Sequence, residues 1–393
     1  MSSAGSPLIY VCRSCRQNVR RASQTPRSFS TTAARSKVIP SFAPTPFPEL
    51  DELLLTWRHK VFMPAALQNH HRALIYKKSR HQTLLNEPGV TVTMSDDEEI
   101  KLEPMNYFDK PNKQKSLRTI AEFLSNTNSD AVWKNLPSFL SGMVLAKQKI
   151  PTYFYQKITR KAGENGKERI IILCAEKAEE TGLKLSKGTV AKELMLAFHT
   201  RAALAGFKGG ELEAAMRWAE KVVRMLEDEL YDADKLKEDE VDARKSPLVA
   251  SVMTELAAAK AIEGQDSDVA KVANYATKML HLAAKEPHTG LDHPPKGDGI
   301  RETRAAANIE LENLLPMQNA IKLALELEPI KNSQLGKELT EKLRSVTDEV
   351  GKNVKVLRDT ADGEPRRGLE MYDQIHGTEY NPVAANEADG KSS

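Results

Sequence analysis

Two cysteines near the N-terminus form the first pattern that could do chemistry. Cys12 and Cys15 stand in a C-x-x-C spacing within YVCRSCRQNVRR, residues 10–21. A structural zinc site needs about four cysteine or histidine ligands, and the chain has only one more cysteine, Cys174. A thioredoxin-like redox pair belongs to a βαβ unit, and no such unit is indicated here. The spacing therefore favours neither a zinc site nor a redox pair, and the apolar run around Cys174 predicts that this thiol is buried.

Other candidate catalytic or metal-binding residues are few. His288, Asp292 and His293 lie in a Pro/Gly-rich stretch without a further cluster of ligands, and His199 lies in the middle of a predicted helix. The chain carries no phosphate-binding glycine loop, no G-x-S-x-G nucleophile elbow and no H-E-x-x-H zinc motif. We therefore predict no enzymatic activity, no cofactor, no metal and no small-molecule substrate, and we interpret His199 as a packing or hydrogen-bonding residue.

The first 48 residues have a distinctive composition. They contain no Asp or Glu and are rich in Arg, Ser, Thr and Ala, which is typical of a mitochondrial transit peptide. The segment RSFSTTAARSK, residues 27–37, resembles fungal presequences that are cut in two steps, and this resemblance places the mature N-terminus near Lys37. We predict a transit peptide over residues 1–36 and a location in the mitochondrial matrix. The alternative is a basic tail with no targeting role.

Charge and hydropathy limit what the rest of the chain can do. Removing residues 1–36 takes away six of the 57 basic residues and none of the 54 acidic ones, so the net charge changes from +3 to −3. A protein that coats nucleic acid along its whole length should be strongly basic, so any RNA contact must be confined to a patch. No run of about 18 apolar residues is present, and we predict no transmembrane segment.

One segment of the mature chain has the composition of such a patch. Residues 37–115 begin with a Pro-rich stretch, predicted to be an extended linker, and continue with 34 residues, 53–86, that contain no acid. Basic side chains reach phosphates and aromatic rings stack on unpaired bases, and Trp57, Phe62 and Tyr76 occur among the basic residues. The alternative is a solvated basic face whose aromatic residues belong to the core. The candidate RNA-binding residues are Arg58, Lys60, Arg72, Lys77, Lys78 and Arg80.

The remainder of the chain predicts an all-α fold. Within a helical domain over residues 116–330, two helix–turn–helix hairpins repeat with an offset of 57 residues, and Gly206 and Gly264 end the first helix of each pair. The arrangement resembles tetratricopeptide repeats, so we predict helical hairpins in a solenoid-like arrangement, with an irregular helical bundle as the alternative. Pro137 and Pro316 are each expected to open a helix.

The C-terminal part falls into two sections. Residues 331–360 predict one long amphipathic helix whose apolar residues follow a seven-residue rhythm. Packing of this helix on its own chain is expected, and a coiled coil with a partner is the alternative. Residues 361–393 predict a polar tail that stays loose unless a partner orders it.

Taken together, RSFSTTAAR, the basic segment LLLTWRHKVFMPAAL…HHRALIYKKSRHQTLL and the helical body resemble mitochondrial ribosomal proteins of filamentous fungi, with the large-subunit type favoured. The resemblance implies a structural constituent of the ribosome in mitochondrial translation, whose partners are mitochondrial rRNA and other mitochondrial ribosomal proteins. One alternative is a helical-repeat factor for mitochondrial RNA processing or translational activation. Another is a scaffold for assembly of respiratory-chain proteins.

Overall fold

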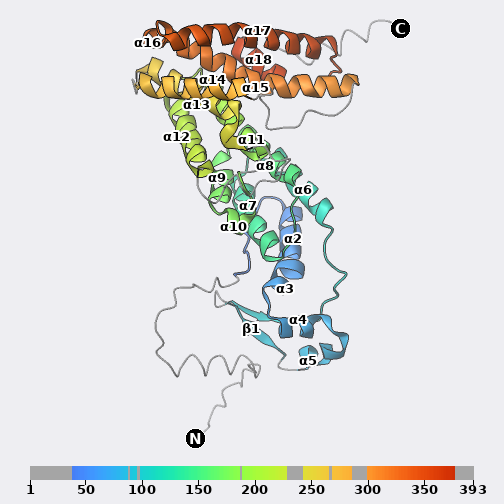
Figure 1. Ribbon diagram of the computed structural model, residues 1–393. Coiled ribbons are helices and arrows are strands. Elements are labelled where there is room, and N and C mark those ends of the chain that lie inside the picture. The colour runs from blue at the N-terminus through green and yellow to red at the C-terminus, as the bar shows by residue number, and fades with distance from the viewer. Residues whose placement is uncertain are drawn as a thin grey trace, which may run out of the picture. The chain divides into compact units, whose positions relative to one another are not determined.

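Helices account for nearly all the regular structure in the computed structural model of the chain (Figure 1). The residues described are 38–86, 89–94, 98–185, 188–227, 242–264, 268–285 and 299–376. They divide into two units, one that runs to Ile150 and also takes in Lys177–Gly182, and one formed by Pro151–Glu176 and the residues from Leu183 onward. The predicted all-α class is confirmed. Among the described helices, none has the length and apolar character needed to cross a bilayer.

The first unit contains short helices, one hairpin and two longer helices. The hairpin pairs Thr91 with Lys101, Val92 with Ile100 and Thr93 with Glu99 in antiparallel register, and it is absent from the sequence prediction. The elements of the first unit are α2 (Pro48–Trp57), the π-helix η1 (Arg58–Phe62), α3 (Met63–Ala66), α4 (Asn69–Tyr76), the 3-10 helix η2 (Lys78–Arg80), α5 (His81–Leu85), β1 (Thr91–Thr93), β2 (Glu99–Lys101), α6 (Lys113–Asn126), α7 (Asp130–Leu145) and α10 (Ala178–Thr181).

The Pro-rich segment before α2 is extended as predicted, but it is not a free linker. Ile39 is buried. The side-chain amide of Asn135, on α7, accepts from the Ala43 N–H and donates to the Ala43 carbonyl, with both distances 2.8 Å. Because the backbone N–H and carbonyl of Ala43 are both satisfied by one side chain that is itself only 4% exposed, the segment is fixed on the first unit.

Pro137 lies inside α7 and does not open it, so this expectation is wrong. An interior proline removes one backbone hydrogen bond and costs roughly 3 kcal/mol. The turn before Pro137 carries Trp133 and Leu136, and the turn after it carries Phe139 and Leu140, all buried. Burial of these side chains outweighs the lost hydrogen bond, and α7 continues.

Gly142 on α7 is the place where the aromatic core allows no side chain. A methyl group at this position would lie 2.5 Å from Cε2 of Phe62, which is fully buried. Gly142→Ala should therefore lower the free energy of unfolding by about 1–3 kcal/mol, as overpacked cores do, although alanine is the better helix former by about 1 kcal/mol. Urea unfolding followed by circular dichroism measures this change.

The matched control is Gly351→Ala, on the last long helix, where an added methyl group meets nothing within 4 Å. This variant should be neutral or slightly stabilising. A Gly142→Ala variant that matches Gly351→Ala in stability would show that Phe62 moves aside at no cost.

The second unit is built from long helices. They are α8 (Thr152–Glu164), α9 (Glu168–Glu176), α11 (Gly188–Leu204), α12 (Gly209–Leu226), the 3-10 helix η5 (Ala243–Lys245), α13 (Pro247–Glu263), α14 (Val269–Lys285), α15 (Ile300–Glu326), α16 (Glu328–Lys331), α17 (Gln334–Asp359) and α18 (Arg367–His376).

The two predicted hairpins are α11–α12 and α13–α14. Gly206 and Gly264 follow the first helix of each pair with φ angles of 61° and 78°, as the sequence predicts. Residues Pro247–Ala259 of α13 are all buried, so this helix lies inside the unit, and its buried side chains are apolar or small apart from Glu255. Lys271 on α14 donates to Glu220 on α12 at 2.6 Å, which links the second helices of the two hairpins. The pairs are stacked in a solenoid-like arrangement.

The C-terminal helices pack on this body. Pro316 does not open a helix, because α15 continues through it and the flanking Leu315 and Met317 are fully buried. Helix α17 lies along α15 (Figure 1), so the seven-residue rhythm serves packing within the chain, as expected. Leu339, Val346 and Val350 are among its buried residues.

Part of the predicted loose tail is structured. Arg367–His376 form α18, which packs on α15 and buries Gly368, Leu369 and Met371. The expectation of a loose tail is wrong for these residues, because Arg367 forms a buried ion pair with Glu193 that the sequence does not reveal. The predicted transit peptide and the end of the predicted tail lie outside the described ranges, which leave out residues 1–37 and 377–393.

Candidate nucleic-acid interface

The basic segment folds into a series of short helices whose geometry follows from one proline. Pro64 has no N–H to continue an α-helix, and its ring would clash with the carbonyl four residues earlier. A wider turn precedes it, in which the Met63 N–H bonds to the Arg58 carbonyl five residues back. Such π turns occur frequently at functional sites. Here the turn lets Trp57, Val61 and Phe62 all face the core of the first unit.

Two of the three aromatic residues proposed to stack on bases are core residues. Trp57 is 2% exposed and Phe62 is fully buried. Their rings contact each other at 5.8 Å between centroids, and each contacts Phe139 at about the same distance, 5.9 and 6.0 Å. The interpretation of these two rings as base-stacking groups is therefore wrong, because burying their large apolar area stabilises the unit more than exposure would allow. Tyr76 is half-buried.

The six basic candidates do not share one environment. Arg58 is turned inward, where its guanidinium donates to the Pro40 carbonyl at 3.1 Å and pairs with Glu98 at 2.6 Å. Its side chain is 15% exposed. Arg58 thus neutralises Glu98 and holds the Pro-rich segment in place through the Pro40 carbonyl.

The other five candidates lie at the surface. Lys60, at the π turn, is exposed, and Lys77, Lys78 and Arg80 form an exposed run around η2. Arg72 is half-exposed and donates to the side-chain oxygen of Asn69. Lys77, Lys78 and Arg80 have no ion pair among the described residues, so their charges face solvent.

Two histidines of this segment have structural environments. Burial, helped by the neighbouring His70, lowers the pKa of His71 to about 4, so its ring is neutral at pH 7. His81 contacts the Ile75 carbonyl at 3.0 Å through Nε2 and so closes the bend between α4 and α5.

The structure adds an aromatic pair that the sequence prediction missed. Tyr107 is 59% exposed and Phe108 is 88% exposed, and Tyr107 contacts Tyr76 with 5.6 Å between ring centroids. Lys110 lies over the Tyr107 ring at 3.8 Å from its centroid. The signal in the sequence was an aromatic dipeptide placed between two turn-forming residues, Asn106 and Asp109.

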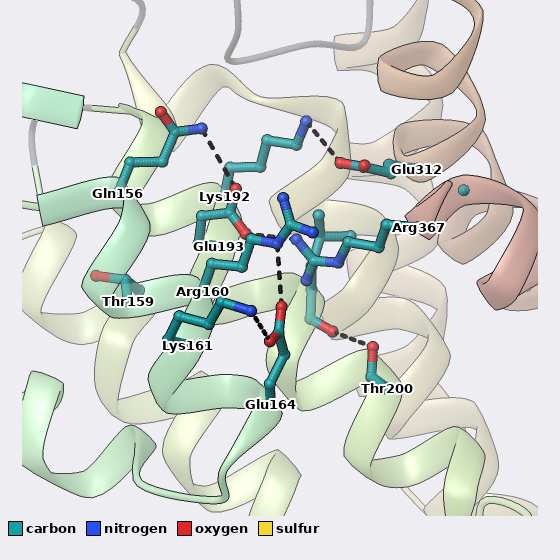
Figure 2. A network of polar contacts seen from close by, with 12 residues as sticks. Gln156, Thr159, Arg160, Lys161, Glu164, Lys192, Glu193, Thr200, Glu312 and Arg367 are labelled. Atoms are coloured by element: carbon teal, nitrogen blue, oxygen red, sulfur yellow. Dashed lines mark hydrogen bonds and ion pairs between the residues drawn. The ribbon is translucent and has the colours of Figure 1, made fainter. Parts of the chain in front are cut away.

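The second unit contains a buried cluster of polar residues, and Figure 2 shows them pointing toward one another. Glu193 on α11 accepts from Gln156 on α8 at 3.3 Å and from Arg367 on α18 at 2.5 Å. Lys192 on α11 pairs with Glu312 on α15 at 3.3 Å. Burial alone would lower the pKa of Arg367, but Glu193 and Glu312 outweigh it and raise that pKa. These contacts satisfy buried charges with one another and hold four helices together.

The remaining polar candidates have structural partners. His199 contacts Glu255 at 2.7 Å, and Asn319 donates to the other oxygen of the same carboxylate at 2.7 Å, which confirms His199 as a hydrogen-bonding residue. Cys174 is buried, as predicted. Within the described ranges, no three His, Cys, Asp or Glu residues are placed to hold a metal. Cys12, Cys15, His288, Asp292 and His293 lie outside those ranges.

Two comparisons relate this sequence to known proteins. The family model described as mitochondrial ribosomal protein mS27 matches residues 27–374. The sequence is also 28% identical over 291 residues to the small ribosomal subunit protein mS27 of Neurospora crassa, an alignment that covers 69% of this chain and 72% of that protein. The resemblance to mitochondrial ribosomal proteins is confirmed. The preference for the large subunit is wrong, since the matching relative is a small-subunit protein.

Proposed function

Since the chain belongs to the mitochondrial ribosomal protein mS27 family, we propose that it occupies the small subunit of the mitochondrial ribosome, in the matrix. Family membership makes it a mitochondrial protein and a structural constituent of the ribosome in mitochondrial translation. Neither a respiratory-chain assembly scaffold nor an RNA-processing or translation-activation factor is favoured. A structural role requires no catalytic residues, and we propose that the chain is not an enzyme.

Contact with rRNA is the part of this function that we assign to the first unit. The observation that carries it is the exposed run of Lys77, Lys78 and Arg80, with Lys60 and Arg72 nearby in sequence, in a stretch without acids from residue 53 to 86. Unpaired surface cations bind phosphate oxygens and release counterions from the nucleic acid. Arg58 contributes indirectly, by fixing the Pro-rich segment beside Glu98.

Contacts with neighbouring ribosomal proteins are assigned to the second unit. Its charges are balanced largely within the chain, as the pairs Glu193–Arg367, Lys192–Glu312 and Glu220–Lys271 illustrate. A helical body of this kind offers extended surfaces to protein partners, and charges that are paired within the chain do not favour binding of RNA phosphates.

Sedimentation of mitochondrial lysate through sucrose gradients tests the assignment. We expect the protein in the small-subunit peak at moderate salt, and we expect it to stay there as salt rises until the subunit itself loses proteins. A transient translation factor would leave the particles at low to moderate salt, and an assembly scaffold would sediment with membranes or free. A protein that is found mainly outside the small-subunit peak, or mainly in the large-subunit peak, would contradict the proposal.

A further inference from the structure

The turn that carries Tyr107 and Phe108 is ordered by its own backbone. The Asp109 N–H bonds to the Asn106 carbonyl at 3.2 Å, and the Phe108 N–H bonds to the Asn106 side-chain oxygen at 3.2 Å. An Asn side chain that bonds the backbone two residues later is a strong turn former. These two hydrogen bonds hold the turn in a shape that exposes the Phe108 ring to solvent. Phe108 is the most exposed of the large apolar side chains in the described ranges.

The turn contacts the end of α4, next to the exposed basic residues. Leu102, a few residues before it, is buried, and the Met105 N–H bonds to the Ile75 carbonyl at 2.8 Å. Tyr107 then packs edge-on against Tyr76, the last residue of α4. Because Lys77 and Lys78 follow Tyr76 directly, the aromatic pair lies beside the start of the exposed cationic run.

Charges near the aromatic pair are mixed in sign and positive in sum. Lys110 lies over the Tyr107 ring, and Lys77, Lys78 and Arg80, which follow Tyr76 in the sequence, are exposed. Of the acids in the described ranges, Glu103 and Asp109 are nearest to the turn in sequence, and both are exposed. An aromatic ring among cations fits a base attached to a phosphate backbone, since the ring stacks on the base while the cations bind the phosphates.

Resting on the proposed rRNA contact, we propose that Tyr107 and Phe108 form a stacking platform for an unpaired base of single-stranded RNA, whose flanking phosphates are bound by Lys77, Lys78 and Lys110. Phe108 stacks on the base face. Tyr107 supports Phe108, with 6.0 Å between the two ring centroids, and is held in turn by Tyr76. A double helix buries its base faces, so the platform selects loops, bulges and single strands.

Binding of fluorescent RNA to the purified full-length mature chain tests the platform. The probes are a 12-nucleotide single strand of mixed sequence and a blunt RNA duplex of the same length. Phe108→Ala should weaken single-strand binding about tenfold, within the range that base–aromatic stacking supplies, and should leave duplex binding unchanged. Phe108→Trp should restore single-strand binding, because indole stacks on bases at least as well.

Two controls separate stacking from other effects. Tyr153→Ala removes an exposed aromatic ring from the second unit, 62% exposed against 59% for Tyr107, and should change binding to neither probe. The double variant Lys77→Ala, Lys78→Ala should lower the affinity for both probes and reduce the dependence of affinity on salt.

Two results would overturn the platform. In one, Phe108→Ala binds the single strand as well as the wild type does while the lysine variant binds it weakly. In the other, Phe108→Ala binds RNA normally but is lost from small-subunit particles, which would assign Phe108 to a protein partner. Both results leave the proposed small-subunit function standing, which fails only if the wild-type chain is absent from the small-subunit peak.

Discussion

Glu193→Ala should lower the free energy of unfolding of the second unit by about 3–5 kcal/mol. The carboxylate is 5% exposed and pairs with Arg367, whose side chain is 13% exposed, while also accepting from Gln156. Removing it leaves the Arg367 guanidinium in a low-dielectric site without its ion-pair partner, which no longer offsets the desolvation cost of that charge. Urea unfolding of the full-length mature chain, followed by circular dichroism, measures the change.

Matched variants show whether burial is the cause. Lys331→Ala breaks an exposed pair with Glu328, 57% and 69% exposed, and should cost less than about 1 kcal/mol. The double variant Glu193→Ala, Arg367→Ala should lose less free energy of unfolding than the sum of the losses of the two single variants. The reason is that Arg367→Ala removes the charge that Glu193→Ala leaves without its partner. If Glu193→Ala were no worse than Lys331→Ala, the buried pair would not stabilise the fold.

Reversing Arg72, Lys77, Lys78 and Arg80 to Glu together should remove the chain from small-subunit particles at salt concentrations that leave the wild type bound. Each lost phosphate contact reduces the slope of log affinity against log salt by about one, and reversal adds repulsion from the phosphates. Helical content should not change, since the first of these side chains is half-exposed and the others are exposed. Gradient sedimentation at several salt concentrations, with circular dichroism in parallel, measures both quantities.

The control for this variant changes net charge by the same amount elsewhere. Lys337, Arg344, Lys352 and Lys355 are all exposed on α17, and their reversal to Glu should leave particle association close to that of the wild type. If the two quadruple variants behave alike, the loss of association is not specific to the basic segment. If the variant of the basic segment remains bound, the assignment of this segment to rRNA is wrong.

Local signals in the sequence predicted the helical hairpins well. A glycine that ends a helix needs a positive φ angle, and Gly206 and Gly264 both have one. The periodic apolar residues of α17 also predicted its packing. Prolines misled the prediction, because Pro137 and Pro316 could open helices only if the preceding turns were free to unwind. Those turns carry buried Trp133 and Leu315, and tertiary packing outweighs the local preference.

The candidate site was predicted in part. Lack of acids located the basic segment, but composition does not distinguish inward from outward side chains, so Arg58, Trp57 and Phe62 were placed with the surface residues. Tyr107 and Phe108 were missed because their position beside Tyr76 depends on a hydrogen bond between Met105 and Ile75, a tertiary contact. Helix α18 was missed for a related reason, since its anchor Arg367 pairs with a residue 174 positions earlier.

That separation has a consequence for how the chain folds. Closing so long a loop costs chain entropy that only the completed contact repays. Chains are synthesised from the N-terminus, so Glu193 exists long before Arg367 does, and until then its carboxylate must stay hydrated. The body of the second unit therefore cannot become fully dry around α11 until α18 has been made. We expect a chain that stops before residue 367 to stay hydrated around Glu193, and an added protease to cut it faster than the complete chain.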